Sequence, residues 1–307
     1  MVTGWNFIDG YWYYFDKYGY MIIGVEKIDE KTYCFDNNGR MVANGWCYDG
    51  LNWYYVENNQ PCGSGWQNIG GTQYYFYDYG WGFGILAADT VIYDGDYRCI
   101  FDSNGHLVTG WYFVEDFRSF NTQWTGGWFY GDEDGHAVTG WKKLGGQWYY
   151  FKKDSAEMYF LCRAYIDGYV YGFEFEGYMV TGWDSFNGKW YYYESDGRQC
   201  DTGWKQIGGT WYYFEPDTYK GFGVMSEGWK EIDGITYYLD NGAMATGWKK
   251  VDGVWYFFES YGAMVTNGWK QLGGVWYFFD ENGEMLTGTQ TLGGQTYVFD
   301  DNGHLIS

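Results

Sequence analysis

Gly247-Trp248-Lys-Lys-Val-Asp-Gly-Val-Trp255-Tyr-Phe-Phe258 is the stretch of the sequence that decides the fold. It contains two short runs of strand-forming residues, and Asp252-Gly253 lies between them. Asp-Gly suits the type I′ or II′ turn of a β-hairpin, because such turns require positive φ angles. A second copy occupies residues 269–279, with Gly273-Gly274 at its turn. The stretch therefore predicts a β-hairpin that recurs along the chain.

A Gly-Trp dipeptide marks the start of most copies, and aligning these dipeptides divides the 307 residues into fourteen units. Because an isolated two-stranded hairpin is marginally stable in water, the units are expected to stack on their neighbours. The sequence predicts an all-β repeat solenoid of stacked two-stranded hairpins. We expect one extended domain over residues 1–307, with units of about 20 residues, cut from a longer protein. The units start at or near Trp5, Val25, Trp46, Trp66, Val91, Trp111, Trp141, Arg163, Trp183, Trp204, Trp229, Trp248, Trp269 and Thr289.

The composition excludes several classes of partner. The net charge is −21, so nucleic acids and anionic membrane surfaces are expected to be repelled. No apolar run approaches the roughly 20 residues that span a bilayer. A quarter of the residues are aromatic, which indicates that rings rather than aliphatic side chains fill the space between hairpins.

The aromatic strand of each unit has four positions with different degrees of variation. The fourth is nearly always Phe, which indicates the interior of the stack. The first position is Trp in seven units, whereas Thr32, Gln73, Val170, Thr236 and Thr296 replace it elsewhere. Since a universal packing requirement would not tolerate both Trp and Thr, this variation favours a ligand-binding role for the Trp face. The phenylalanines are Phe15, Phe35, Phe76, Phe101, Phe151, Phe173, Phe214, Phe258, Phe279 and Phe299, and the seven tryptophans are Trp12, Trp53, Trp148, Trp190, Trp211, Trp255 and Trp276.

Catalytic and metal chemistry find little support in the sequence. His106, His136 and His304 all follow the glycine of an acidic loop, so they read as equivalent turn residues rather than as one catalytic base. Residues 132–135 resemble part of a calcium loop but lack the terminal Glu of an EF-hand, which favours a solvated turn. We therefore expect no catalytic residue, no cofactor and no metal site.

The six cysteines show no CxxC spacing, so zinc is not expected. The favoured interpretation is isolated thiols that pack as small side chains, and the alternative is a disulfide between Cys47 and Cys62. The irregular unit around residues 111–130, with Trp111, Trp124 and Trp128, is open to two interpretations: an atypical site or a kink.

Residues 203–214 and 242–248 carry a family resemblance, with Gly-Trp-Lys-Gln-Ile-Gly-Gly-Thr-Trp-Tyr-Tyr-Phe in the first stretch and Gly-Ala-Met-Ala-Thr-Gly-Trp in the second. Both resemble the cell-wall-binding repeats of choline-binding proteins. The resemblance implies a left-handed β-solenoid that binds the choline of teichoic acids between consecutive units. Each site would combine the Gly-Trp tryptophan and the strand tryptophan of one unit with a tyrosine of the next, and a Met or Leu nearby. Similar repeats in glucansucrases and bacterial toxins bind carbohydrate, so an α-glucan or host glycan is the alternative ligand.

Four sets of residues match this arrangement, and the resemblance implies choline binding at each. Three other tryptophan pairs depart from it: Trp5 and Trp12 would meet Cys34, Trp141 and Trp148 would meet Gly172, and Trp269 and Trp276 would meet Val298. We expect a non-catalytic module, secreted and held at a Gram-positive cell surface or carried by a phage lysin. The four matching sets are Trp46, Trp53 and Tyr75; Trp183, Trp190 and Tyr213; Trp204, Trp211 and Tyr238; and Trp248, Trp255 and Phe278.

Overall fold

The structure, a computed structural model, describes residues 1–78, 83–115, 126–216 and 222–307. Its backbone divides into two compact units, Met1–Phe160 and Leu161–Ser307, each of which is described by itself. None of the described residues lies in a helix, so no described segment forms a helix able to cross a membrane. The prediction of an all-β fold built from stacked two-stranded hairpins is confirmed, whereas the expected single domain stays a prediction.

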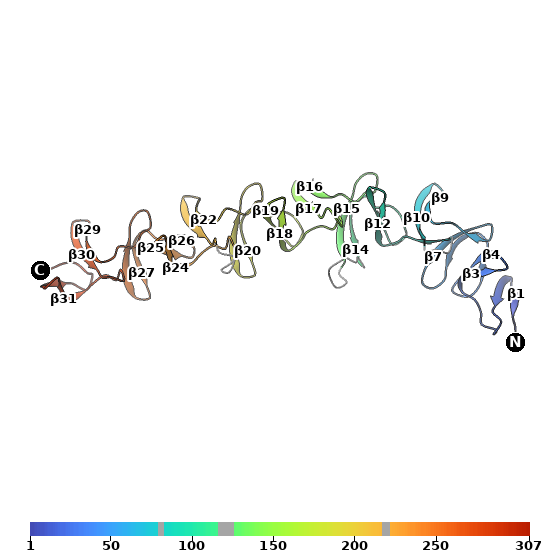
Figure 1. Cartoon of the computed structure of the whole chain (residues 1–307), viewed down its shortest axis with the longest axis horizontal. Coiled ribbons are helices and arrows are strands. Elements are labelled where there is room, and N and C mark those ends of the chain that lie inside the picture. Colours follow the sequence, from blue (N-terminus) through green and yellow to red (C-terminus); the bar gives the residue numbers. More distant parts are fainter. Residues whose placement is uncertain (79–82, 116–125, 217–221) are drawn as a thin grey trace. The chain divides into compact units, whose positions relative to one another are not determined.

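The first unit contains seven antiparallel hairpins in its described residues, and three of them gain a short third strand: β5, β8 and β11. Figure 1 shows these hairpins following one another in chain order. The strands are β1 (Gly4–Ile8), β2 (Tyr11–Phe15), β3 (Gly24–Ile28), β4 (Lys31–Phe35), β5 (Met41–Val42), β6 (Gly45–Tyr48), β7 (Trp53–Glu57), β8 (Gln60–Pro61), β9 (Gly65–Ile69), β10 (Thr72–Asp78), β11 (Gly84–Leu86), β12 (Thr90–Asp94), β13 (Tyr97–Phe101), β14 (Gly110–Val114), β15 (Gly127–Gly131), β16 (Gly140–Leu144) and β17 (Gln147–Phe151).

The second unit contains seven more hairpins in the part of it that is described, one of them extended by β26. They also follow one another in chain order (Figure 1). The strands are β18 (Cys162–Ile166), β19 (Tyr169–Phe173), β20 (Gly182–Phe186), β21 (Lys189–Tyr193), β22 (Gly203–Ile207), β23 (Thr210–Phe214), β24 (Gly228–Ile232), β25 (Ile235–Asp240), β26 (Ala243–Met244), β27 (Gly247–Val251), β28 (Val254–Phe258), β29 (Gly268–Leu272), β30 (Val275–Phe279), β31 (Gly288–Leu292) and β32 (Gln295–Phe299).

The hairpin turns adopt the conformation that their sequence predicts. Asp252 and Gly253 have φ angles of 49° and 89°, and Gly273 and Gly274 have φ angles of 57° and 86°. Positive φ at both central residues defines a type I′ turn, whose twist matches that of the flanking strands. Both strands are therefore held in the register that pairs Trp248 with Phe257.

Six of the acidic loops, those that open with Asp16, Asp36, Asp102, Asp132, Asp280 and Asp300, share one hydrogen-bonding pattern. In the last loop the Asp300 carboxylate accepts the backbone N–H groups of Asn302 and His304, at 2.9 and 2.8 Å. Gly303 of this loop has a φ of 79°, and a Cβ there would overlap the sulfur of Met285. The glycine is thus required twice, once for the turn and once for the methionine that packs on it.

The interior of each stack is lined by the fourth position of the aromatic strands, as predicted. The phenylalanines at this position are buried, apart from the half-buried Phe15 of the first hairpin. In the second hairpin of the second unit Tyr193 takes this place and is also fully buried. Eight of these phenylalanines pack on the Gly-Trp tryptophan of the preceding hairpin, for example Phe279 on Trp248 with 5.7 Å between ring centroids. One aromatic position therefore joins neighbouring hairpins within each unit.

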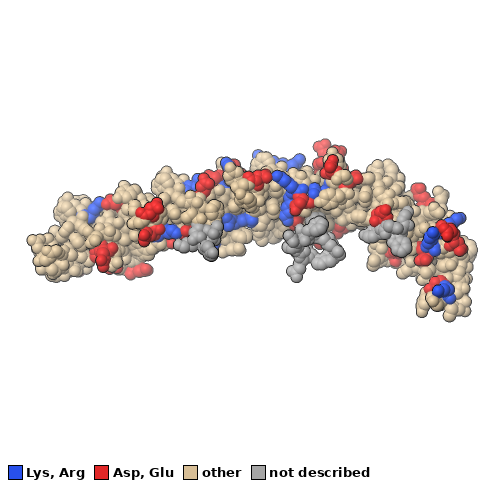
Figure 2. All heavy atoms as spheres, in the orientation of Figure 1, with Lys and Arg blue, Asp and Glu red and all other residues tan. Residues whose placement is uncertain are grey.

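Consecutive hairpins of the second unit are also joined by a ladder of ion pairs. At four of its junctions, the lysine after the Gly-Trp dipeptide contacts the acidic residue that opens the preceding loop. Lys230 binds both carboxylate oxygens of Glu215, at 2.6 and 2.8 Å, and Ser226 donates a further hydrogen bond to Glu215. On the face drawn in Figure 2, acidic and basic side chains lie interspersed. The pairs are Lys205–Glu194, Lys230–Glu215, Lys249–Asp240 and Lys270–Glu259.

The first unit contains a disulfide that the sequence analysis did not identify. Cys34 of β4 is bonded to Cys47 of β6, with 6.6 Å between their Cα atoms. The alternative Cys47–Cys62 pairing is wrong, and so is the interpretation of Cys34 and Cys47 as isolated thiols. The reason is that two stacked hairpins bring these strands together, which spacing along the chain does not reveal. The other four cysteines form no disulfide in the described structure, and burial raises the pKa of Cys62 to about 11.

Candidate functional site

Each site begins with two tryptophans on the same face of one hairpin. Trp248 of β27 and Trp255 of β28 lie on neighbouring strands, because Trp248 pairs with Phe257 and side chains alternate along the strand. Their ring centroids are 6.2 Å apart and the planes meet at 87°. Two walls at a right angle thus face the following hairpin.

The third wall comes from the following hairpin, but not from the residue that was predicted. Tyr277 of β30 lies 4.8 Å from Trp248 between ring centroids, whereas Phe278 packs on Trp269 of its own hairpin at 5.1 Å. A stacked hairpin presents opposite faces to its two neighbours. The face of a hairpin that contacts the preceding hairpin therefore carries the second and fourth aromatic positions, not the third.

The same correction applies to the other three predicted sets. The structure places Tyr74, Tyr212 and Tyr237 against the Gly-Trp tryptophans, at 5.0, 4.8 and 4.8 Å. The predicted rings pack within their own hairpins instead. Those are Tyr75 on Trp66, Tyr213 on Trp204 and Tyr238 on Trp229. The predicted tryptophans Trp46, Trp53, Trp183, Trp190, Trp204, Trp211, Trp248 and Trp255 keep their places in the four sets.

A methionine or leucine forms the floor of each set. The backbone N–H of Met285 donates to the carbonyl of Trp255 at 2.9 Å, and Met285 also bridges to Phe279. The same hydrogen bond joins Met225 to Trp190 and Leu305 to Trp276. The floor is therefore positioned by the backbone and not only by side-chain packing.

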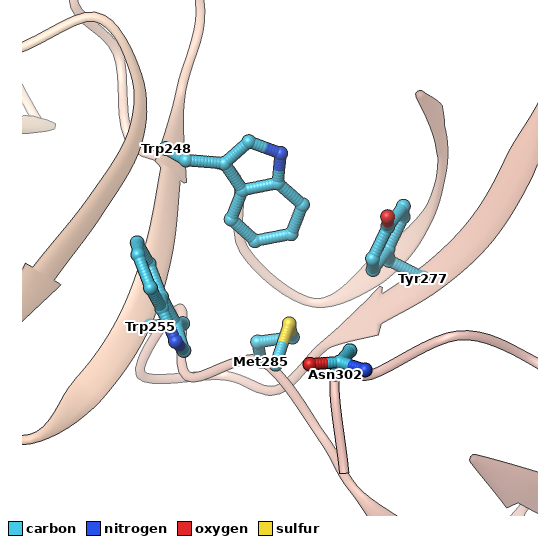
Figure 3. Close-up of a pocket in the computed structure, with 5 residues that line it drawn as sticks. All are labelled: Trp248, Trp255, Tyr277, Met285 and Asn302. Atoms are coloured by element: carbon cyan, nitrogen blue, oxygen red, sulfur yellow. The ribbon is translucent and has the colours of Figure 1, made fainter. Parts of the chain in front are cut away.

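The three ring walls and the floor surround a small cavity. Figure 3 shows Trp248, Trp255 and Tyr277 around a common space, with Met285 and Asn302 below. Its volume is about 280 Å³, which lies below the usual range for drug-sized ligands. A second cavity of about 280 Å³ is lined by Trp46, Trp53, Tyr74 and Leu86, together with Ser103, Asn104 and His106. Such a space suits a compact head group with a ring on three sides.

We call this arrangement of two tryptophans, the following tyrosine and a Met or Leu an aromatic cage. Within the two units the described residues form seven cages, more than the four that were predicted. Tyrosine and Gly-Trp tryptophan are 4.8–5.0 Å apart in all seven. The cages are Trp5/Trp12/Tyr33/Met41, Trp46/Trp53/Tyr74/Leu86, Trp111/Trp128/Tyr149/Met158, Trp183/Trp190/Tyr212/Met225, Trp204/Trp211/Tyr237/Met244, Trp248/Trp255/Tyr277/Met285 and Trp269/Trp276/Tyr297/Leu305.

Two of these cages involve pairs that were expected to depart from the pattern. Trp5 and Trp12 face Tyr33 rather than Cys34, and Trp269 and Trp276 face Tyr297 rather than Val298. The departures followed from the one-residue error in the third ring. Trp141 and Trp148 are 6.5 Å apart in the last hairpin of the first unit.

The irregular segment, for which the sequence left an atypical site or a kink open, contributes a cage that was not among the four predicted sets. β14 pairs with β15, which places Trp128 6.3 Å from Trp111 at 84°. The unusually long connection between the two strands hid Trp128, although the acidic loop after it is regular. Trp124 lies outside the described residues. The tryptophans at the second place are 40–46% exposed in all eight hairpins that have one there, so these rings are available to a ligand.

Two hairpins carry an arginine where a cage would have a tryptophan. Arg163 takes the Gly-Trp position, and its guanidinium carbon lies 3.7 Å from the centroid of the Tyr191 ring. Arg98 takes the second tryptophan position, lies 4.4 Å from the Tyr93 ring centroid, and donates to the carbonyl of Asp154. At the first of these places, the chain's own cation lies against the tyrosine that would form the third wall of a cage.

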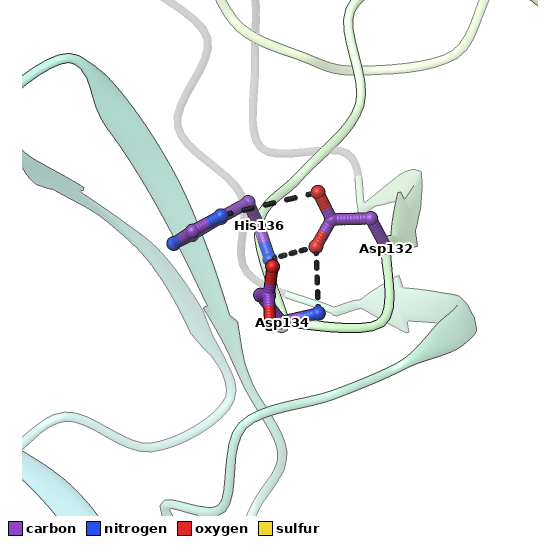
Figure 4. Close-up of side chains that lie close together, drawn as sticks. All are labelled: Asp132, Asp134 and His136. Carbon is purple, nitrogen blue, oxygen red and sulfur yellow. Dashed lines mark hydrogen bonds and ion pairs between the residues drawn. The ribbon is translucent and has the colours of Figure 1, made fainter.

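The acidic loop at residues 132–136 brings together Asp132, Asp134 and His136 (Figure 4). The Asp132 carboxylate accepts the backbone N–H groups of Asp134 and His136, at 3.0 and 2.9 Å. Because the loop at Asp300 makes the same two hydrogen bonds, the group is one copy of a recurring turn.

Two family models match parts of the chain. A choline-binding repeat model matches residues 2–46, 202–246 and 245–287, and a putative cell wall binding repeat model matches residues 64–80 and 139–154. Together they cover just over half of the chain. No curated protein matches it.

Two solved structures match almost the full length of the chain. The chain is 28% identical to CbpJ from Streptococcus pneumoniae, with a TM-score of 0.54, over 99% of this chain and 100% of that one. It is 26% identical to choline binding protein F from the same species, with a TM-score of 0.51, over 99% and 98% of the two chains.

Proposed function

The chain belongs to the choline-binding, cell-wall-binding repeat family, and from this premise we propose that its aromatic cages bind the choline groups of teichoic acids. The observation that supports the proposal best is the cage geometry itself. Two tryptophans meet at close to a right angle, and a tyrosine closes the third side. Rings on three sides of a compact cavity suit a quaternary ammonium, which is attracted to ring faces from every direction. A sugar would instead be served by one broad stacking platform.

The cages supply weak individual sites. A ring contributes about 0.5–1 kcal/mol when exposed and about 2 kcal/mol when desolvated. Three rings then give roughly 4 kcal/mol, or a Kd on the order of 1 mM. Several cages on one chain can engage a polymer that repeats the ligand, which raises the overall affinity without new contacts. The net charge of −21 adds a long-range attraction for cations.

The two tryptophans of a cage have different structural roles. Trp248 contacts Trp255, Phe257, Tyr277 and Phe279, so it serves both the stack and the cavity. The second tryptophan is replaced by Thr32 and Thr236 in hairpins that still form. It is therefore the position where binding can be removed with the least effect on folding.

We propose that the module is non-catalytic and holds its parent protein at the outer surface of the cell wall. The hairpins place binding rings and turn carboxylates at regular intervals along the chain, which suits repeated binding of one small group. A lysin or another secreted protein would use it as an anchor.

Titration of tryptophan fluorescence with choline chloride tests the proposal. Trp12→Ala and Trp211→Ala should each remove one site of similar affinity, because both rings complete a cage. Tyr165→Ala is the control, since Tyr165 is an exposed ring in a hairpin whose Gly-Trp place holds Arg163; it should leave binding unchanged. A response to dextran without one to millimolar choline would instead indicate the glucan-binding alternative.

A further inference from the structure

Two cages have a histidine behind their tyrosine. In the first, His106 of the acidic loop 102–106 lies 5.5 Å from Tyr74 between ring centroids. Its Nε2 atom is 3.1 Å from the Tyr74 hydroxyl, and the side chain lines the same cavity as Trp46 and Trp53. The histidine is therefore a polar part of the cage wall.

His304 has the same place in the cage of Trp248 and Trp255. Its ring lies 5.5 Å from Tyr277 at 79°, and it follows the glycine of the loop that supplies Asn302 to the cavity. The third histidine, His136, stacks on Tyr97 at 4.3 Å, beside a hairpin without tryptophan pairs. Both cavities of about 280 Å³ thus have a histidine at their tyrosine wall.

Other cages provide a natural comparison, because they have alanine at the equivalent loop position. The residue after the loop glycine is Ala243 for the cage of Trp183 and Trp190. It is Ala263 for the cage of Trp204 and Trp211. The chain therefore contains two cages with a titratable group behind the tyrosine and two with a methyl group there.

The histidines are coupled to carboxylates on the side away from the cage. The Nδ1 atom of His106 is 3.5 Å from Asp102 Oδ2, and the Nδ1 atom of His304 is 3.0 Å from Asp300 Oδ2. A neutral imidazole leaves the carboxylate as the net charge behind the tyrosine, which favours a bound cation. A protonated imidazole cancels that charge and places its own positive charge nearer to the ligand.

We propose that His106 and His304 make their two cages sensitive to pH, so that mild acid weakens quaternary ammonium binding there. The affinity of the two cages with Ala243 or Ala263 at the equivalent position, the alanine-walled cages, should not change. This inference rests on the proposed choline-binding function. Histidine is the side chain whose charge ordinarily changes between pH 5 and 8. A quaternary ammonium carries its charge at every pH, so a pH dependence of affinity reports on the protein alone.

The charged and titratable groups around each histidine are few. Tyr74 faces His106 from β10, and Asp102 faces it from its own loop. Asp89, on the segment before β12, donates its backbone N–H to the Asp102 carbonyl, and its carboxylate accepts a hydrogen bond from the Tyr112 hydroxyl. Tyr277 faces His304 from β30, and Asp300 faces it from its own loop. The hydrogen bond from the backbone N–H of His304 lowers the pKa of Asp300.

The size of the effect follows from the separation of the two charges. A cation on the cage side of the tyrosine would lie on the order of 8 Å from the imidazole, where like charges weaken binding by about twofold at the dielectric constant of water and by about thirtyfold at the effective value near a protein surface. Both histidine side chains are nearly half exposed. Solvent screening therefore places the expected effect at about threefold.

The test is a choline titration followed by tryptophan fluorescence and calorimetry at pH 7.5 and 5.5, on the full chain. Wild-type protein should lose affinity about threefold at pH 5.5 in a subset of its sites. The variant His106→Ala/His304→Ala reproduces the residues of the alanine-walled cages and should bind equally at both pH values. The variant Trp53→Thr/Trp255→Thr removes the two histidine-walled cages, using the residue that Thr32 and Thr236 already show to be compatible with the hairpin. Its remaining sites should show no pH dependence.

Three results would overturn the inference. Equal wild-type affinity at both pH values would refute the pH effect alone and leave choline binding intact. An unchanged pH dependence in either double variant would assign the effect to other groups. Absence of choline binding at both pH values would overturn the proposed function together with the inference. Circular dichroism at both pH values establishes that each variant stays folded.

Discussion

Two junctions of the second unit share one backbone arrangement but differ in what faces their common tyrosine. At the cage of Trp248 and Trp255, the wall formed by Tyr277 faces an open cavity. At the junction after β18 and β19, the corresponding Tyr191 faces the guanidinium of Arg163 at 3.7 Å. The tyrosine is thus common to both, and the neighbouring residues decide whether the cation comes from a ligand or from the chain.

The Arg163 junction differs at every other place of the cage as well. Val170 stands where the second tryptophan would be, and Gln199 replaces the methionine and accepts a hydrogen bond from Arg163. Tyr193 replaces the buried phenylalanine. These changes fit together physically, because a guanidinium requires polar partners that Met and Phe do not offer. We interpret this junction as one that closes without ligand.

The largest effect is expected from the buried ring at the cage junction. Phe279→Ala should lower the free energy of unfolding by about 3–5 kcal/mol, because it leaves a cavity between two hairpins. Urea denaturation measures the loss. Trp255→Thr is the matched control and should leave the urea midpoint nearly unchanged in the absence of choline. Equal losses for the two variants would contradict the separation of packing and binding positions.

The buried tyrosine of the Arg163 junction should respond to alkali. Burial raises the pKa of Tyr193 to about 12, with Arg163 acting in the opposite direction. Since the folded value lies above the unfolded one, the stabilisation is complete below pH 10 and is lost as the pH rises towards 12. Wild-type protein should lose about 2–3 kcal/mol more than Tyr193→Phe over that interval. Denaturation at several pH values compares them, and parallel curves would show that Tyr193 does not contribute.

An intermediate effect is expected from converting one junction into the other. Arg163→Trp combined with Val170→Trp rebuilds two cage walls opposite Tyr191 and should add one choline site. With a Kd on the order of 1 mM, 10 mM choline should then stabilise the variant by about 1.4 kcal/mol more than wild type. Thermal unfolding with and without choline provides the measurement. No added site would show that Gln199 or Tyr193 also blocks the ligand.

The smallest effect concerns the charges that flank the two junctions. Lys270 pairs with Glu259 at the cage junction, whereas Glu174 at the Arg163 junction has Asp184 and Glu176 near it. Burial first, and then these carboxylates, raise the pKa of Glu174. A raised value means that stability is present at low pH and is lost as the pH rises through the folded value. Glu174→Gln should therefore stabilise the protein at pH 7 by at most about 0.5 kcal/mol, and a loss of stability would contradict this account.

Most of the fold could be predicted from the sequence because its signals are local. Asp252-Gly253 specifies a turn, and the alternation along residues 255–258 assigns two faces within one hairpin. The tryptophans of the cages were recognised for the same reason. Trp128 could not be assigned to a cage from the sequence, because a long connection separates it from Trp111 and pattern matching depends on constant spacing.

Contacts between hairpins could not be predicted from the sequence in the same way. The identity of the third ring depends on which face of one hairpin meets the next, and residue spacing is the same for Tyr277 and Phe278. The bond between Cys34 and Cys47 depends on the approach of β4 and β6 in the stack.

The amino-acid sequence was sufficient to establish the hairpin, its repetition, the buried phenylalanines and the aromatic chemistry of the site. All of these follow from neighbours along one strand or across one turn. The tertiary structure was needed to select the tyrosine, to count the cages, to find the guanidinium over Tyr191 and to bring His106 to Tyr74. Each of these contacts joins hairpins that are separate in sequence, so each depends on how the hairpins stack.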